Sequence, residues 1–302
     1  MNSYALETND LVKIYHNGIN PFGQKTNAVD GLTLRVPEGS IYGLLGRNSA
    51  GKTSTIRVFG LDPARDPERV TVLKQVGYVP EEKTLVASLT VRSMLQLNRA
   101  FYPATWSDDL ARKLCQRLEL PLDLAFIRAS LGNKTKTALV MAIAQRSRLL
   151  ILDEPTTGLD PVVLDELLGI LVEDCTADGR TVFLSSHQLP EIEKIADFIG
   201  IMDRGKLLIE GRLDDIRASF RRLTATGANL PADGPEVLSC RQEARVTRYI
   251  LRCNPSDFER RLMVDGAVIL ESMPLSLNEI FLELCRTTEA DSGGREEAQV
   301  SA

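Results

Sequence analysis

An octapeptide near residue 50 holds the residues whose types and spacing most directly suggest chemistry. Gly46-Arg47-Asn48-Ser49-Ala50-Gly51-Lys52-Thr53 fits the pattern G-x-x-x-x-G-K-[ST], in which a glycine-rich loop wraps phosphate groups. Gly46 and Gly51 allow successive backbone N–H groups to point at phosphate oxygens. Lys52 can reach the β- and γ-phosphates, and the Thr53 hydroxyl can hold Mg²⁺. The octapeptide therefore predicts a nucleotide site with bound Mg²⁺.

Two acids follow a second apolar run downstream. Leu149-Leu150-Ile151-Leu152 is followed directly by Asp153 and Glu154. A buried parallel strand has this pattern, and the acids then emerge at its carboxyl end, beside the phosphate loop. We expect Asp153 to hold the hydration shell of Mg²⁺ and Glu154 to act as the base that polarises an attacking water. Without the upstream loop, the same residues would indicate only a core strand with solvated acids at its tip.

A histidine follows a third apolar run. The chain has two histidines, His16 and His187, and His187 comes after residues 181–184 and two serines. A lone histidine is more often structural than catalytic, but the order of the preceding elements favours contact between His187 and a γ-phosphate. The position of His16 supports no such role.

The elements that must position these residues alternate between apolar strands and longer helical patterns, which indicates an α/β fold. The strand before the loop spans residues 41–45, and Ser54-Thr55-Ile56-Arg57 can open the helix after it. Residues from about 84 to 147 have helical spacing, broken by Pro103 and Pro121, and are expected to form a helical insertion. Further strands are expected at residues 32–36, 75–79, 149–152, 181–184, 198–202 and 206–209.

The composition changes after Arg212, which predicts a second, smaller α+β module. We expect a helix over Asp215–Leu223 and a linker over Ala225–Pro235, which is rich in Gly, Ala and Pro. Strands at residues 245–253 and 267–273 and helices at residues 256–264 and 275–285 complete the module. The predicted boundaries are 1–215 for the nucleotide-binding domain, 216–286 for the module and 287–302 for a polar, disordered tail.

Bulk properties exclude several classes of protein. The 302 residues are 43% hydrophobic and 25% charged, as in ordinary soluble globular proteins. The net charge of −5 argues against a general nucleic-acid or anionic-membrane binder, although a local basic patch is compatible with it. No segment approaches the roughly 18 apolar residues of a membrane span, and the N-terminus lacks a secretory signal pattern. Five scattered cysteines fit a reduced cytosol better than a disulfide or zinc framework.

In this order the motifs resemble the nucleotide-binding domain of ATP-binding-cassette (ABC) transporters, over about residues 4–215. Glu154–Pro161, which includes Asp160, is close to the family's Walker B exit and D-loop, and Leu184–His187 matches its H-loop. Tyr15 stands where the family has an aromatic ring that stacks on adenine, although a buried core tyrosine is the alternative. The resemblance implies a P-loop NTPase cassette: a RecA-like core, an antiparallel β subdomain and a helical subdomain.

Three features depart from the family pattern. The family signature L-S-G-G-Q corresponds to residues 129–133, where only Ser130 and Gly132, the pair that contacts the γ-phosphate, are kept. The Q-loop glutamine falls at Glu81, which can still approach water or Mg²⁺ but adds a negative charge. About a dozen residues of the family pattern are missing after Arg57, which leaves a helix of about two turns, near 12 Å. The shorter helix would bury less apolar surface, which could cost several kcal/mol of folding stability. Either this cassette gains stability elsewhere, or its function is impaired.

The resemblance implies an ATPase subunit of a bacterial export-type transporter, peripheral on the cytoplasmic face of the inner membrane. A separate polytopic membrane permease would be one partner. A second cassette, identical or different, would sandwich ATP between the Gly46–Thr53 loop of one chain and the Ser130–Gly132 segment of the other. The alternatives are a catalytically weak regulatory or assembly cassette and a soluble ABC ATPase acting on ribosomes or DNA. The acidic composition disfavours the last, and no nucleic-acid partner is expected.

Overall fold

The structure is a computed structural model that describes residues 3–16, 25–46, 57–61, 63, 66–83, 85–176, 178–227, 230–252 and 255–287. The chain divides into two compact units, Met1–Glu210 and Gly211–Ala302. The boundary that the sequence predicts, after residue 215, lies inside helix α7 (Leu213–Ser219). Of the predicted tail, only Thr287 lies among the described residues.

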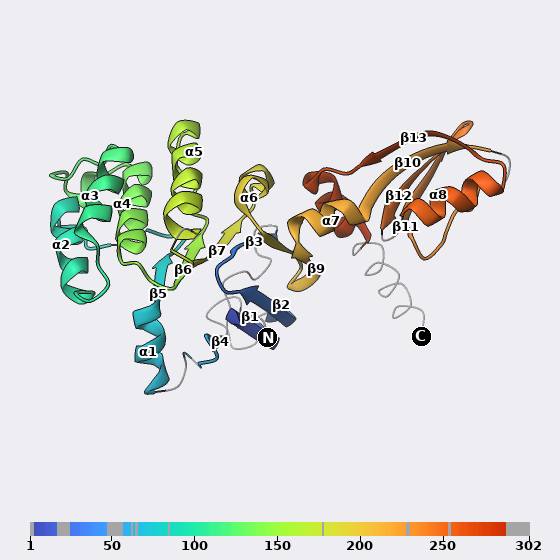
Figure 1. Cartoon of the computed structure of the whole chain (residues 1–302). Coiled ribbons are helices and arrows are strands. Elements are labelled where there is room, and N and C mark those ends of the chain that lie inside the picture. Colours follow the sequence, from blue (N-terminus) through green and yellow to red (C-terminus); the bar gives the residue numbers. More distant parts are fainter. Residues whose placement is uncertain are drawn as a thin grey trace. The chain divides into compact units, whose positions relative to one another are not determined.

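A six-stranded sheet with the order β5-β6-β7-β3-β8-β9 forms the centre of the first unit (Figure 1). Strand β3 pairs in parallel with β7 and β8, and β6 pairs in parallel with β5 and β7. The carboxyl ends of these parallel strands therefore meet at one edge of the sheet. The strands are β3 (Ile41–Gly46), β5 (Val76–Val79), β6 (Leu149–Asp153), β7 (Thr181–Ser186), β8 (Phe198–Asp203) and β9 (Lys206–Arg212).

A three-stranded antiparallel sheet packs against the central sheet. Its order is β2-β1-β4, with β1 (Tyr4–His16), β2 (Lys25–Pro37) and β4 (Arg57–Val58). Leu32, Leu34 and Val36 alternate along β2 and share one buried cluster with Tyr42 and Leu44 of β3. Helix α1 (Glu68–Gln75), which the sequence did not predict, adds Val72 to this cluster. The helix predicted after the phosphate loop does not reach Arg57, because that residue belongs to β4.

Three helices lie side by side within residues 84–147: α2 (Val91–Phe101), α3 (Asp108–Arg117) and α4 (Leu131–Ala144) (Figure 1). Thr90, Ser107 and Ser130 cap them, each accepting a hydrogen bond from the N–H three residues later. Such caps satisfy N–H groups that have no partner inside the helix. A short 3-10 turn, η1 (Phe126–Arg128), precedes α4.

The remaining helices of the first unit flank the central sheet. They are α5 (Pro161–Ile170), followed directly by a π-helical turn, η2 (Leu171–Thr176), and α6 (Leu189–Ile195). Arg117 of α3 forms ion pairs with Glu166 of α5 and Glu173 of η2. The helical group is thereby tied to helices that follow β6 in the chain.

The second unit is a four-stranded antiparallel sheet with the order β11-β12-β10-β13. Strand β10, the first of the four in the chain, therefore lies inside the sheet between β12 and β13. Helix α8 (Pro255–Val264) packs Phe258 and Leu262 on Leu223, Tyr249 and Leu251. A last helix spans residues 277–287. The strands are β10 (Phe220–Thr226), β11 (Val237–Glu243), β12 (Val246–Arg252) and β13 (Val268–Pro274).

Two predictions for this unit were wrong. The expected helix over Asp215–Leu223 ends at Ser219, and β10 begins at Phe220. Ile216, Phe220 and Leu223 have helical spacing, but pairing of β10 with β12 and β13 outweighs this local pattern. The expected linker from Ala225 to Pro235 begins only after β10 ends at Thr226. Strand β11 went unpredicted because it is an edge strand of partly exposed, mostly polar residues.

Candidate functional site

The phosphate-binding octapeptide begins where β3 ends. Gly46 is the last residue of β3 and pairs with Met202 of β8. The other predicted residues of this motif, Arg47, Asn48, Ser49, Ala50, Gly51, Lys52, Thr53 and Ser54, lie outside the described residues. The backbone of Tyr15 lies in β1 opposite Thr26, and its side chain is outside the described part.

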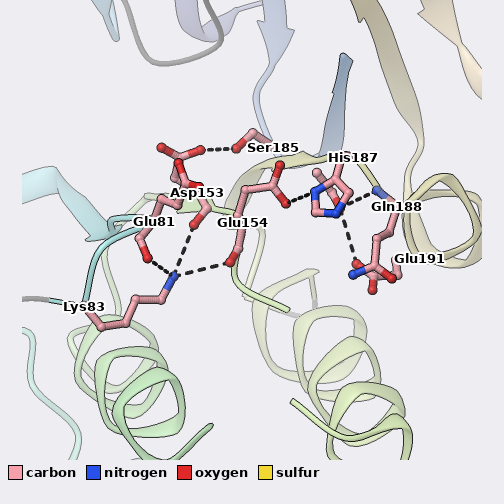
Figure 2. Close-up of polar contacts among 9 residues, drawn as sticks. Glu81, Lys83, Asp153, Glu154, Ser185, His187, Gln188 and Glu191 are labelled. Atoms are coloured by element: carbon pink, nitrogen blue, oxygen red, sulfur yellow. Dashed lines mark hydrogen bonds and ion pairs between the residues drawn. The ribbon is translucent and has the colours of Figure 1, made fainter. Parts of the chain in front are cut away.

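Asp153 ends β6, but β6 is not the neighbour of the strand that carries the phosphate loop. Strand β7 lies between β3 and β6, so one strand separates the strand that ends in Asp153 from the strand that ends in Gly46. The Ser185 hydroxyl of β7 donates a hydrogen bond to Asp153 Oδ1 (Figure 2). Asp153 is only 8% exposed. The intervening strand therefore orients the carboxylate that the sequence assigned to Mg²⁺.

Glu154 has an unusual backbone conformation and is held through its N–H and its carboxylate. Its backbone has a φ of 44°, a left-handed conformation that costs a non-glycine residue on the order of 1 kcal/mol or more. Its N–H donates to Ser185 O at 3.1 Å. Its carboxylate Oε2 lies 2.8 Å from His187 Nδ1 (Figure 2). An ionised Glu154 accepts this bond from Nδ1–H, so the contact orients both the carboxylate and the imidazole ring.

Lys83 is a buried cation that sequence reasoning missed. Lys83 is 7% exposed. Its Nζ donates to the main-chain oxygens of Glu81, Asp153 and Glu154 (Figure 2). Burial lowers the pKa of Lys83, and the charges of Asp153, Glu81 and Glu154 partly oppose that shift. The Glu81 residue itself is exposed. The sequence offers little signal for Lys83, since a lysine after a strand usually lies in solvent.

A third carboxylate, Glu191, lies on the first turn of α6 beside the Ser186–His187 segment. It is 4% exposed, and Ser186 Oγ donates to its Oε2 at 3.4 Å. The same hydroxyl accepts from the Gln188 N–H at 3.0 Å (Figure 2). Burial raises the pKa of the Glu191 carboxyl, and the hydroxyl of Ser186 partly offsets this.

The predicted signature and D-loop residues lie at the starts of two helices. Ser130 and Gly132 are at the start of α4, and Asp160 is at the start of α5. Ser130 Oγ accepts from the Asn133 N–H at 3.2 Å and caps α4. Asp160 caps α5, and the N–H groups of Val163 and Val162 lower the pKa of its carboxyl. A Cβ atom on Gly132 would stand 2.8 Å from Gly158 O. The signature segment therefore packs closely against the segment that follows Glu154.

The carboxylate of Asp153 has the donor chemistry that Mg²⁺ uses. Among the described residues, no group of three or more His, Cys, Asp or Glu side chains could hold a metal ion. Mg²⁺ does not need such a cage, because it usually binds one or two protein groups together with substrate phosphates. Asp153, oriented by Ser185 at the strand edge, fits that donor set.

Comparison with known proteins identifies the family. The ABC transporter family profile matches residues 29–157. The chain is 34% identical over 236 residues to the bacitracin transport ATP-binding protein BcrA of Enterococcus faecalis, with 73% of each chain aligned. The chain belongs to the ABC transporter family. A second relative is the daunorubicin/doxorubicin resistance ATP-binding protein DrrA of Streptomyces peucetius. That protein is 33% identical over 259 residues, which cover 78% of this chain and 74% of DrrA.

Solved structures agree with this assignment of the ABC cassette. An ATP-binding subunit of an ABC transporter superposes with a TM-score of 0.60 at 29% identity, covering 71% of this chain and 92% of that one. The dimeric cassette MJ0796 superposes with a TM-score of 0.59 at 20% identity, covering 69% of this chain and 98% of that one, and supports the fold. No helix in the described ranges combines the length and apolar character needed to cross a bilayer. This chain is thus an ATP-binding and ATP-hydrolysing ABC subunit.

Proposed function

We propose that this ABC cassette hydrolyses Mg²⁺–ATP at the carboxyl edge of its six-stranded sheet and drives transport through a separate polytopic membrane permease. It would act from the cytoplasmic face of the inner membrane. The pair of Glu154 and His187, with 2.8 Å between carboxylate and imidazole, is the observation that carries the proposal. BcrA and DrrA, the relatives of this chain, are named for bacitracin transport and for drug resistance.

In the proposed reaction Glu154 accepts a proton from the water that attacks the γ-phosphorus. The bond from this phosphorus to the bridging oxygen breaks, and ADP and phosphate leave. His187 and Lys52 would stabilise the charge on the γ-phosphate. Thr53 and Asp153 would hold Mg²⁺, with Glu81 able to approach it. When bound, this ion would neutralise charge on the phosphate oxygens.

The proposed assembly pairs two cassettes. The Gly46–Thr53 loop, with Arg47, Asn48, Ser49, Ala50 and Ser54, would grip the phosphates in one chain, and Tyr15 would stack on adenine. Ser130, Gly132 and Asp160 of the second cassette would close over the nucleotide. Ser130 already stands at the N-terminus of α4, where backbone N–H groups favour an anion.

A catalytically weak cassette is the second candidate function. Leu131 stands where the ABC signature has a glycine, and its side chain is 51% exposed at the start of α4. An isobutyl group here reduces the space for a nucleotide held by the partner cassette.

ATPase assays on the full chain with Glu154→Gln and His187→Ala test the catalytic part of the proposal. We expect kcat to fall by about 10² to 10⁴ for Glu154→Gln, the range of a lost general base. Glu271→Gln, which alters an exposed glutamate of β13, serves as the matched control. Turnover near background in both wild type and Glu154→Gln would favour the catalytically weak cassette. Equal but substantial turnover would instead reject Glu154 as the base.

Co-purification from membranes tests the partner. We expect the chain to be recovered with a polytopic membrane protein. Recovery only with ribosomes would contradict the transporter role and favour the soluble alternative.

A further inference from the structure

The ammonium group of Lys83 joins two segments of the site that are far apart in the chain. Nζ lies 3.0 Å from Glu81 O, 3.3 Å from Glu154 O and 3.4 Å from Asp153 O. The first oxygen belongs to the loop after β5, and the other two belong to the end of β6. One buried side chain thus bridges both segments (Figure 2).

The acceptors of Lys83 are main-chain oxygens, although carboxylates lie close by. The Asp153 carboxylate is turned towards Ser185, and the Glu154 carboxylate towards His187. A buried ammonium group is costly unless acceptors satisfy it, and here the backbone supplies them. The contact therefore constrains the path of the main chain, whereas Ser185 and His187 orient the two carboxylates.

The backbone that Lys83 contacts is the one that needs restraint. Glu154 has a φ of 44°, and such a conformation persists only where the surroundings enforce it. Ser185 O accepts from its N–H, and His187 fixes its carboxylate. Its carbonyl accepts from Lys83 and, at 3.4 Å, from the Thr157 N–H. Lys83 therefore supplies the shorter of these two bonds, at 3.3 Å.

Lys83 also lines a surface cavity of about 210 Å³ together with Tyr78, Tyr102 and Met141. The residue therefore connects the surface near the end of β5 with the interior of the site. Movement of the loop at Glu81 would be passed to the Glu154 backbone through this side chain, in addition to the pairing of β5 with β6.

We propose that Lys83 is a positioning residue for ATP hydrolysis, which holds the main chain of Asp153 and Glu154 and couples it to the loop at Glu81. The proposal rests on the role of Glu154 as the base proposed above. In this proposal Lys83 affects hydrolysis by positioning Glu154 and does not itself bind ATP.

Steady-state kinetics of the full chain with Lys83→Met test the inference, with Lys74→Met on the exposed face of α1 as the matched control. Methionine keeps an unbranched chain of similar length but removes the donors. We expect kcat to fall by about tenfold to a hundredfold, since misplacing a catalytic group by about 1 Å has that effect. The KM for ATP should stay within about threefold, because the phosphate loop is untouched. Lys83→Arg, which keeps N–H donors, should recover part of kcat.

Two outcomes overturn the inference. Unchanged kcat in Lys83→Met would show that the carbonyl contacts do not orient the base. A parallel loss of kcat and ATP affinity would indicate general damage to the site. If Lys83→Met fails to fold, Lys83→Gln decides the question by the same comparison of kcat with KM. Normal turnover in Glu154→Gln would reject both the role of Glu154 as base and the positioning role of Lys83. An inactive Glu154→Gln together with a fully active Lys83→Met would reject only the positioning role of Lys83.

Discussion

Three consecutive residues at the end of β7 each hold a different acid of the site. Ser185 donates to Asp153, Ser186 donates to Glu191, and His187 contacts Glu154. Three carboxylates close together repel one another when ionised, so each needs a specific partner to stay in place. The end of β7 is therefore the element that orients the chemistry, although the predicted catalytic acids lie on β6.

Replacing Ser185 with alanine should weaken the use of Mg²⁺. The hydroxyl is the group that fixes Asp153 Oδ1, and loss of such a supporting contact typically lowers metal affinity by about tenfold to a hundredfold. ATPase activity measured against Mg²⁺ concentration should show a corresponding rise in the half-saturating concentration. Ser185→Thr, which keeps the hydroxyl, should stay near wild type. An unchanged Mg²⁺ dependence in the alanine variant would contradict the assignment of Asp153 to the metal.

Glu191→Gln should stabilise the fold at neutral pH. Burial raises the pKa of Glu191 in the folded state, so ionisation opposes folding at pH values above that pKa. This cost disappears as the pH falls through the folded pKa towards the ordinary value of 4.5. Thermal unfolding between pH 4.5 and 8 should show the variant more stable by on the order of 1 kcal/mol near pH 7, with the difference shrinking in acid. A difference that grows as the pH falls would contradict this account.

At the scale of elements, the sequence predicted the strands that are buried on both faces. Strands β3, β6 and β7 read as apolar runs, and the structure has all three. Their spatial order could not be predicted, because no local pattern states that β7 separates β3 from β6. Strand β10 was mistaken for helix because its buried residues continue the helical spacing of α7.

For the site, too, local sequence patterns predict some residues but not those that depend on contacts between distant segments. Asp153, Glu154 and His187 could be predicted because each follows an apolar run, and the structure brings them together. Lys83 and Glu191 could not, since an acid in the first turn of α6 and a lysine after β5 are ordinary surface patterns. Their burial arises only when segments distant in the chain pack together.

The packing of α4 on the segment after Glu154 gives a prediction at this scale. A Cβ atom on Gly132 would stand 2.8 Å from Gly158 O, so Gly132→Ala must push the start of α4 away. We expect a loss of about 1 to 3 kcal/mol in unfolding free energy together with lower ATPase activity. Gly169→Ala in α5 is the control, because its Cβ would meet only Arg117 Nη2, at 3.9 Å. Equal stability of the two variants would show that α4 does not need this close approach.

At the scale of the whole molecule, each of the two units contains a buried apolar cluster of its own. The cluster of the second unit lies entirely beyond Gly211. Its buried members are Leu223, Ala225, Tyr249, Leu251, Phe258 and Leu262. A cluster of the first unit draws on its two sheets and α1. A domain with its own buried core can unfold as its own cooperative step. The full chain should therefore show two calorimetric transitions.

Phe258→Ala should move only one of these transitions. The Phe258 ring is 2% exposed and packs edge-on against Tyr249 at 5.2 Å between ring centroids, so its removal leaves a cavity and costs about 3 to 5 kcal/mol. Calorimetry should show the transition of the second unit at a lower temperature and that of the first unit unchanged. Phe101→Ala, in which a residue that is 70% exposed on α2 loses its ring, serves as the control. It should change the unfolding free energy of neither unit by more than about 0.5 kcal/mol. A common shift of both transitions in Phe258→Ala would mean that the two cores unfold as one cooperative block.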